Sequence, residues 1–210
     1  MTSTPGRVQR LPRAQRRVQL LAAAQRVFVE KGYHAAAMED IADEAGISKP
    51  VLYQHFPGKL DLYLALIDEA CDRIQGLVLE ALNSSDDPKD RVYATIAVFF
   101  QFVGEADGGY RLIFESDLGN EERVRERLER AETAVCEAIA DRITRDTELP
   151  RDYAMFLGLT LAGMAQISAR AWLDHGTGIP QADAARAAGH LAWRGIGTYP
   201  SRATVKDRQS

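Results

Sequence analysis

Hydrophobic residues recur every three to four positions along most of the chain, which is the period of an amphipathic α-helix. In the first such segment Val18, Leu21, Ala24 and Phe28 fall on one side. Gly32 follows them, at a point where a residue in the left-handed conformation commonly ends a helix. No convincing period-two alternation, which would mark a half-buried strand, interrupts this pattern. We therefore predict an all-α fold.

Glycine, proline and capping residues divide the pattern into successive helices. Pro12 suits the first turn of a helix. Asp87 and Pro88 open a helix that we expect to last until Gly108, and Asn120 caps the next amphipathic segment. The expected helices cover residues 12–32, 38–45, 49–55, 59–82 and 88–108, and further helices begin near 121, 150 and 181.

The composition is that of a soluble globular protein: the 210 residues (23.2 kDa) are 46% hydrophobic and 27% charged. No apolar run approaches the roughly 18 residues that a membrane-spanning helix needs. The basic N-terminus is not followed by the apolar stretch of a signal peptide. Cys71 and Cys136 are too few for a disulfide framework or a thiolate zinc site, and we expect both thiols to be buried. We therefore expect a cytoplasmic protein with no membrane partner.

Charge is distributed unevenly along the chain. Residues 1–60 carry nine Lys and Arg against five Asp and Glu, a balance of +4. Because the net charge of the chain is −4, residues 61–210 carry a balance of −8. The first seventeen residues hold five arginines and no acidic residue. A basic end on an acidic body suggests that this end contacts a polyanion, although a solvated tail that aids solubility would carry the same charge.

Two short helices joined at Gly46-Ile47-Ser48 predict a helix-turn-helix, with Ser48 as the N-cap of the second helix. In this motif the second helix lies in the major groove and presents its N-terminal residues to base edges. Here those residues are Ser48, Lys49, Pro50 and Val51. Any three-helix domain can contain such a turn, so the spacing alone does not decide whether the chain binds DNA.

Residues 20–66 resemble the DNA-binding domain of TetR-family transcriptional regulators. The motifs that carry the resemblance are Ile41-Ala42-x-x-Ala45-Gly46-Ile47-Ser48, Leu52-Tyr53-Gln54-His55-Phe56 and Lys59-x-x-Leu62. The resemblance implies a homodimer whose N-terminal domains bind double-stranded DNA at a near-palindromic operator and whose C-terminal domains bind a small effector. It divides the chain into a basic arm (1–12), a helix-turn-helix domain (13–58), a ligand-binding and dimerisation domain (59–200) and a tail expected to be flexible (201–210).

The resemblance also implies roles for individual residues. Tyr53 and His55 match positions that contact phosphates, and Lys59 would add its amine and a backbone N–H. Lys49 and the residue after it match base-reading positions. The basic arm either reaches along the phosphates and the minor groove or is a disordered tail with a weak nonspecific effect. The expected DNA-binding residues are Arg13, Arg16, Arg17, Ser48, Lys49, Pro50, Val51, Tyr53, Gln54, His55 and Lys59.

Two positions depart from the family pattern. Ala36 and Ala37 stand where the family usually has the Ser or Thr that caps the second helix and contacts a phosphate, so we do not expect a side-chain phosphate contact there. Pro50 replaces a glycine or small polar residue. Because Pro50 has no N–H, it and Val51 can offer a base only apolar contact, for instance with a thymine methyl group.

The segment 91–103 is apolar around most of its circumference, as a helix in the middle of a bundle is. A plain core helix would explain this, but the resemblance places an effector cavity here. Because we expect no buried cluster of charges, we favour a hydrophobic effector. Tyr110–Asp117 and Ala192–Ile196 are similar to actinobacterial regulators of fatty-acid synthesis that sense long-chain acyl-CoA. The expected ligand-binding residues are Tyr93, Ile96, Phe99, Phe100, Val103, Phe114, Phe156 and Met164.

Small residues at three-to-four spacing mark the last two helices, where members of the family dimerise through a four-helix bundle. Small side chains allow helices to approach closely, either between two subunits or within one chain. The expected dimer-interface residues are Gly158, Ala162, Ala184, Ala188 and Ala192.

Sequence motifs for nucleotide binding, zinc proteases and serine hydrolases are absent from the chain, so we expect no catalytic residues, no metal and no cofactor. A ligand-gated repressor or activator is the favoured function. The alternatives are a small-molecule enzyme built on a helical bundle and a nonspecific DNA-binding protein. The effector, the operator and the sign of regulation are left open.

Overall fold

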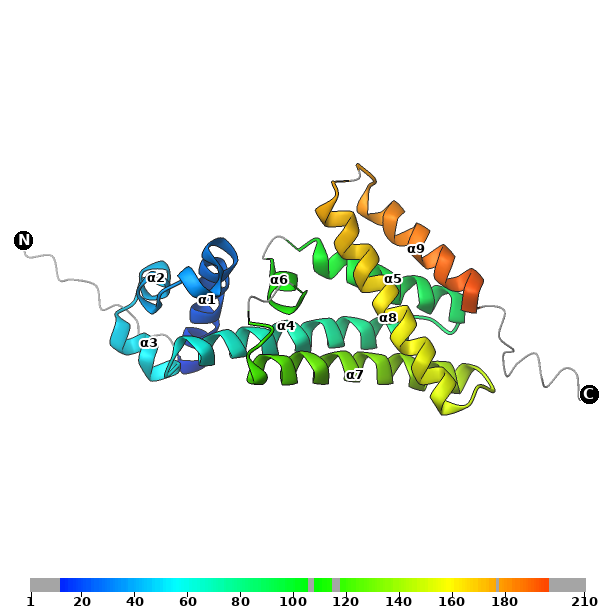
Figure 1. Cartoon of the computed structure of the whole chain (residues 1–210), viewed down its shortest axis with the longest axis horizontal. Helices are drawn as coiled ribbons and strands as arrows, with labels where there is room; N and C mark the ends of the chain where they lie inside the picture. Colours follow the sequence, from blue (N-terminus) through cyan, green and yellow to red (C-terminus); the bar gives the residue numbers. More distant parts are fainter. Residues whose placement is uncertain (1–11, 106–107, 115–117, 177, 197–210) are drawn as a thin grey trace, which may run out of the picture. The chain divides into compact units, whose positions relative to one another are not determined.

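The computed structural model describes residues 12–105, 108–114, 118–176 and 178–196, except for the side chains of 112–114 and 196. Every regular element in these ranges is an α-helix, which confirms the predicted fold class (Figure 1). The chain divides into two compact units, Met1–Leu66 and Ile67–Ser210. The boundary falls inside the long helix α4 (Lys59–Leu82), whereas the sequence placed the domain boundary at the start of that helix.

The N-terminal unit consists of α1 (Arg13–Ala35), α2 (Met38–Glu44), α3 (Lys49–His55) and the start of α4. Pro12 is the N-cap of α1, and α1 is interrupted at Gly32, whose φ of 73° only glycine adopts freely. Helix α1 packs against α2, and α2 packs against α3. Gly46, with a φ of 64°, makes the turn between α2 and α3. The core of this unit includes Leu20, Phe28, Ile41, Leu52 and Leu62.

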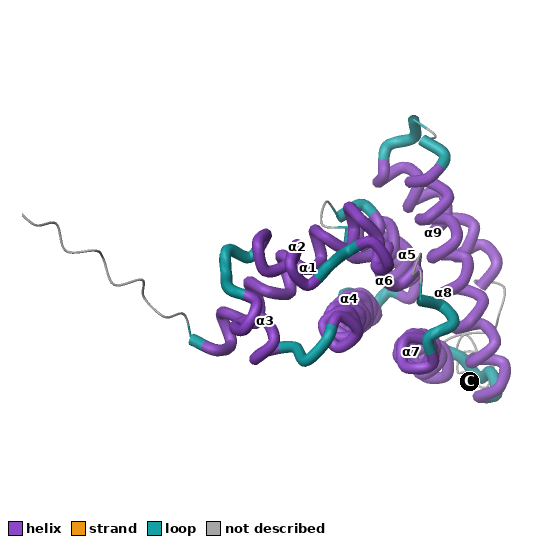
Figure 2. The backbone as a smooth tube through the Cα atoms, turned by 60° about the vertical axis from the view of Figure 1, so that its left-hand side comes forward, coloured by secondary structure: helices purple, strands orange, loops and turns teal. Residues whose placement is uncertain are grey.

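The C-terminal unit contains the rest of α4 together with α5 (Pro88–Val103), α6 (Gly109–Phe114), α7 (Glu122–Asp146), α8 (Arg151–Asp174) and α9 (Gln181–Ile196). Helix α5 contacts both α8 and α9, and α7 packs along α8 (Figures 1 and 2). The core of the C-terminal unit includes Ile96, Phe100, Phe102 and Val103 from α5, so the predicted central helix is buried.

Helix α5 begins where the sequence predicted, because the side chain of Asp87 accepts a hydrogen bond from the N–H of Lys89 at 2.8 Å. It ends at Gly104 and not at Gly108. The side-chain amide of Gln181, at the start of α9, donates to the carbonyl of Phe100 at 2.6 Å. The carbonyl of Phe100 thus accepts from Gln181 as well as from the N–H of Gly104, which links the last turn of α5 to the start of α9.

The small residues of α8 pack within the chain. Ala154, Gly158, Ala162, Ala165 and Ala169 are all buried. A Cβ atom built on Gly158 would lie 2.7 Å from the carbonyl oxygen of Cys136 in α7. Gly158 and Ala162, which we expected at a dimer interface, therefore allow α8 to approach α7.

The small residues of α9 also face their own chain. A Cβ atom on Gly189 would lie 2.9 Å from the ring of Tyr93 in α5, and Ala192 is buried. Ala184 and Ala188 pack, half-buried, against the same core. The alternative of packing within one chain therefore accounts for these residues of α9.

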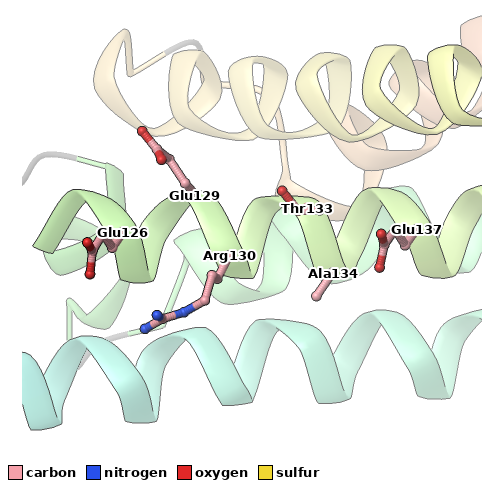
Figure 3. Close-up of a pocket in the computed structure, with 6 residues that line it drawn as sticks. All are labelled: Glu126, Glu129, Arg130, Thr133, Ala134 and Glu137. Carbon is pink, nitrogen blue, oxygen red and sulfur yellow. The ribbon is translucent and has the colours of Figure 1, made fainter. Parts of the chain in front are cut away.

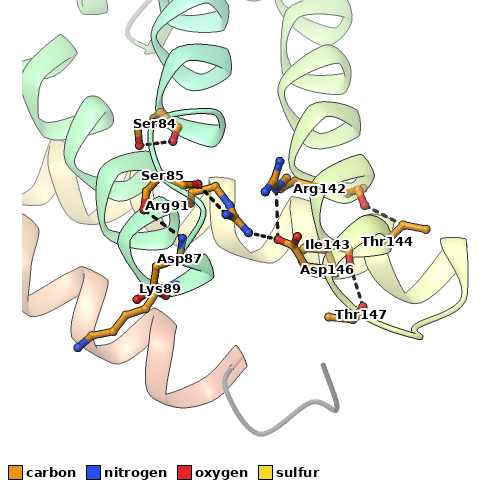
Figure 4. A network of polar contacts seen from close by, with 12 residues as sticks. Ser84, Ser85, Asp87, Lys89, Arg91, Arg142, Ile143, Thr144, Asp146 and Thr147 are labelled. Carbon is orange, nitrogen blue, oxygen red and sulfur yellow. Dashed lines mark hydrogen bonds and ion pairs between the residues drawn. The ribbon is translucent and has the colours of Figure 1, made fainter. Parts of the chain in front are cut away.

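One charged side chain is buried in the C-terminal unit, contrary to the expectation of a core without charge clusters (Figure 4). Arg91 is 2% exposed, donates to the carbonyl of Ser85 at 2.7 Å and pairs with Asp146 near the end of α7. Arg142 pairs with the same carboxylate at 3.3 Å. These contacts tie the start of α5 to the end of α7.

None of the helices within the described ranges combines the length and the apolar character needed to cross a membrane.

The close approach at Gly158 predicts an unusual response to alanine. Replacing a helical glycine by alanine ordinarily stabilises a protein by up to about 1 kcal/mol. We expect Gly158→Ala instead to lower the free energy of unfolding by about 1–3 kcal/mol, because the added methyl group would overlap the α7 backbone. Gly76→Ala in α4 is the matched control, since no atom lies within 4 Å of its Cβ position. Urea unfolding measures both, and a stabilised Gly158→Ala protein would contradict this packing.

Candidate DNA-binding surface and ligand pocket

Helix α3 turns its predicted recognition residues toward solvent. Leu52 and Phe56 are buried and fix the helix on the unit, while Tyr53 is 48% exposed. Ser48 occupies the N-cap as predicted, but its hydroxyl makes no capping hydrogen bond. Of the predicted recognition residues, Ser48, Lys49, Pro50, Tyr53 and Gln54 are exposed, and Val51 and His55 are half-buried.

The basic residues of α1 lie beside the end of α3. The guanidinium of Arg17 stacks over the Phe56 ring, 4.6 Å from its centroid. Burial, followed by the charges of Arg13, Arg16 and Arg17, lowers the pKa of His55 below its ordinary value. The structure thus brings these three arginines together with His55. The arm residues 1–11, including Arg7 and Arg10, lie outside the described residues.

At the start of α2 the carboxylate of Asp40, the third helical residue, binds the backbone of the N-cap residue Ala37, although the capping hydroxyl is missing. The backbone N–H of Ala37 donates to Asp40 at 3.0 Å, and Lys31 pairs with the same carboxylate at 3.1 Å. The hydrogen bond from Ala37 and the contact with Lys31 lower the pKa of Asp40. This contact satisfies the N–H of Ala37 and places negative charge near the position where the family usually has a hydroxyl.

Lys49, the predicted base-reading residue, forms an ion pair with Glu39 in the first turn of α2. Both side chains are about half exposed, so the pair lies on the surface of the unit. Glu39 is not among the residues that the sequence pattern predicts at the site.

The ammonium group of Lys59 is bound within the N-terminal unit. It donates to the carbonyls of Tyr33 at 2.8 Å and Ala36 at 2.9 Å, and it lies 4.4 Å from the centroid of the Tyr33 ring. Carbonyls at the end of a helix carry partial negative charge, so the ammonium closes the end of α1. The amine that we expected on a phosphate is thus engaged elsewhere in this structure.

A small apolar pocket of about 110 Å³ lies in the C-terminal unit. Ile74 of α4, Phe99 of α5 and Ala162 of α8 contribute to its walls, and Glu132 and Gln166 are its polar residues. The remaining lining residues, Leu128, Ala131 and Val135, come from α7.

Of the expected ligand-binding residues whose side chains the structure describes, only Phe99 lines this pocket. Phe156 is 66% exposed, so its side chain does not belong to the interior of the unit. Tyr93 faces α9, where its hydroxyl lies 3.0 Å from Nδ1 of His190. Ile96, Phe100 and Val103 are core residues, Met164 packs half-buried against them, and the side chain of Phe114 lies outside the described residues.

A second hollow, of about 530 Å³, lies along the outer face of α7 (Figure 3). All six residues that line it come from this one helix, and three of them are glutamates: Glu126, Glu129, Arg130, Thr133, Ala134 and Glu137. A surface formed by a single solvated helix lacks the enclosing apolar walls of a ligand site. In the part of the chain that is described, no three His, Cys, Asp or Glu side chains gather as metal ligands.

Large apolar side chains are exposed on α8 and α9, on the opposite side of α8 from its buried small residues. We call this set the α8–α9 apolar surface; it comprises Tyr153, Phe156, Leu159, Ile167 and Leu191. Side chains of this size are expensive to leave in water, so the surface is a candidate for contact with a partner.

The position of Lys59 makes a testable prediction about the free protein. Lys59→Met would leave the carbonyls of Tyr33 and Ala36 without their donor, at a cost of about 1–3 kcal/mol. We expect amide exchange around residues 33–37 to accelerate, and Lys59→Arg to restore part of the protection. Hydrogen exchange with mass spectrometry measures this locally. Unchanged exchange in Lys59→Met would show that the ammonium does not hold this segment.

Comparisons with known proteins agree with this geometry. Residues 20–66 match the family model described as bacterial regulatory proteins, tetR family. The HTH-type transcriptional activator FasR of Mycolicibacterium smegmatis is 42% identical over 191 residues, covering 91% of this chain and 87% of that protein.

Two solved structures share the fold. A TetR-like regulator from Rhodococcus sp. RHA1 is 27% identical, with a TM-score of 0.68 over 90% of this chain and 100% of that chain. FadR of Bacillus subtilis, solved with stearoyl-CoA, is 18% identical, with a TM-score of 0.66 over 83% of this chain and 96% of that chain. The relatives are regulators and not enzymes. The chain therefore belongs to the TetR family of DNA-binding transcriptional regulators.

Proposed function

We propose that the protein acts as a homodimer on a near-palindromic operator and that a small hydrophobic effector in the C-terminal unit controls its binding to DNA. The observation that carries the proposal is the apolar pocket on Ile74 and Phe99, because Ile74 lies on α4, the helix that begins in the DNA-binding unit. Long-chain acyl-CoA or the free fatty acid is the effector class we favour. FasR is an activator by name and FadR was solved with stearoyl-CoA, so both the sign of regulation and the effector need direct measurement.

On DNA, α3 would enter the major groove and the surrounding groups would hold the phosphates. Tyr53 and Gln54 are exposed and can donate to phosphate oxygens, and Arg13, Arg16 and Arg17 add positive charge. The first backbone N–H groups of α4 have no acceptor within their own helix, so they can bind a phosphate even though the Lys59 amine is engaged.

The pocket must enlarge to hold a long acyl chain. Its volume of about 110 Å³ is well below the ~300–1,000 Å³ of typical ligand sites. An entering chain would therefore displace the side chains of the wall, Ile74 on α4 among them. Movement of α4 would change the position of its first turn and so the docking of the paired recognition helices. Such coupling is typically worth about 1–3 kcal/mol and is reciprocal between effector and operator.

The α8–α9 apolar surface supports the homodimer. A second copy could cover Phe156 and Ile167 by a two-fold contact in which the same surface is used by both chains. Because the small residues of α8 and α9 pack within the chain, the large exposed side chains of the α8–α9 apolar surface would make the main contacts between the two copies. Ala184 and Ala188 are half-buried and remain candidates for its edge.

The effector is tested by filling the pocket. In the native protein, stearoyl-CoA should change operator affinity by about 5- to 150-fold, measured by fluorescence anisotropy on a duplex selected from a random pool. Ala131→Leu adds three carbons to the pocket and should abolish this response. Ala134→Leu, on the outer face of the same helix, is the matched control and should respond normally.

Two results would count against the proposal. One is a native protein whose operator affinity is unchanged by both acyl-CoA and free fatty acid. The other is an Ala131→Leu variant that responds as the native protein does. If no duplex gives a footprint with clear boundaries, the protein binds DNA nonspecifically instead.

The homodimer is tested by placing charge on the α8–α9 apolar surface. Ile167→Glu, at a side chain that is 70% exposed, should not disturb the folded chain but should repel its copy across a two-fold axis. Sedimentation should show monomers, and operator affinity should fall about 100-fold or more as the second half-site is lost. Leu79→Glu on α4 is an equally apolar exposed position outside this surface and should leave the dimer intact. A dimeric Ile167→Glu protein would move the interface elsewhere.

A further inference from the structure

The ion pair between Glu39 and Lys49 joins the first turns of the two helices of the helix-turn-helix. Lys49 is the first residue of α3 and the only lysine of that helix. Its ammonium therefore sits beside a carboxylate at the N-terminal end of the proposed recognition helix, the end that meets base edges in this motif.

The other acidic residues of α2 for which the structure shows partners pair away from the recognition helix. Asp40 pairs with Lys31 and accepts the N–H of Ala37, and Glu44 pairs with Arg26 at 2.6 Å. Lys31 and Arg26 both belong to α1. Glu39 thus differs from Asp40 and Glu44 in binding a cation of α3.

Stability does not explain this pair. Ion pairs between exposed side chains are worth about 0–1 kcal/mol, and both members are about half exposed. Near DNA the pair has a larger consequence. A lysine free to neutralise a phosphate releases counterions, and each such contact contributes about 0.9 to the slope of log affinity against log salt. A lysine held by a carboxylate loses that sequence-independent contribution.

The two groups together also match one kind of base edge. In the major groove guanine offers two acceptors, N7 and O6, and its cytosine partner offers the N4 amino donor. An ammonium bound to guanine and a carboxylate accepting from cytosine complement a G·C pair. An A·T pair presents its amino donor, adenine N6, between the acceptors N7 and O4, so the two groups would meet donor and acceptors in a different order, which is a penalty against wrong sites.

We propose that Glu39 is a positioning residue for Lys49 that sets DNA specificity: it withholds the Lys49 ammonium from phosphates and directs it to the base edge of a G·C pair. This inference rests on the proposed function, because it requires that α3 bind in the major groove.

The test uses Glu39→Gln in the full-length protein. The affinity for a duplex of unrelated sequence should rise about fivefold at 0.15 M salt, with a salt slope steeper by about 0.9. Preference for G·C at one position of each half-site should relax in a selection from random duplexes. Glu44→Gln is the matched control, because it breaks an ion pair of the same helix that does not involve α3, and it should change neither quantity.

The Lys49→Met background separates positioning from simple charge removal. There, Glu39→Gln should leave the salt slope unchanged, because no ammonium remains to be freed. The proposal is overturned if Glu39→Gln has no effect on slope and base preference, or if it raises nonspecific affinity equally in the Lys49→Met background. If the native protein itself gives no bounded footprint on any duplex, the proposed function fails and this inference fails with it.

Discussion

The ammonium group of Lys59 joins the start of α4 to the end of α1, next to the helix-turn-helix. It satisfies the carbonyls of Tyr33 and Ala36 and stacks on the Tyr33 ring. That ring in turn contacts Tyr63 of α4, with 5.1 Å between ring centroids. The chain enters α2 directly after this junction, and α2 carries α3. A single cation thus contacts the segment that leads into the helix-turn-helix and joins it to α4.

Charge on that surface is more closely balanced than the basic N-terminal sequence suggests. Lys31, Lys49 and Lys59 are all engaged within the unit, the first two by carboxylates of α2. Among the residues that the structure describes, Arg13, Arg16 and Arg17 on α1 add positive charge near α3, beside His55. Affinity for phosphate and discrimination among bases are thus assigned to different residues, the arginines and the pair formed by Glu39 and Lys49.

Much of the fold could be predicted because it depends on local signals. Gly46 and the pair Asp87-Pro88 mark helix ends that the structure confirms, whereas Gly32 interrupts α1, which continues to Ala35. The contact between the last turn of α5 and Gln181 could not be predicted, since Gln181 belongs to a helix that is distant in sequence. The buried Arg91 was also missed, because its partners lie in the loop before α5 and at the end of α7.

The lining of the C-terminal pocket could not be predicted from residue type alone, as Phe156 in α8 illustrates. The small residues of α8 face α7, so Phe156 is turned to solvent. The inward positions of α7 supply the wall that was overlooked, at Leu128, Ala131 and Val135. Their helical spacing was visible in the sequence, but their proximity to Phe99 depends on how the helices pack.

Regulation by an effector requires that one assembly bind both DNA and effector, and that the binding of each ligand change the affinity for the other. Native mass spectrometry of the protein with its selected operator and stearoyl-CoA measures this directly, because it counts chains, duplexes and ligands in each complex. We predict complexes of two chains with one duplex. As ligand-bound dimers form, the population of DNA-bound dimers should change. A single chain on the duplex, or equal ligand occupancy in the free and DNA-bound dimers, would contradict the account.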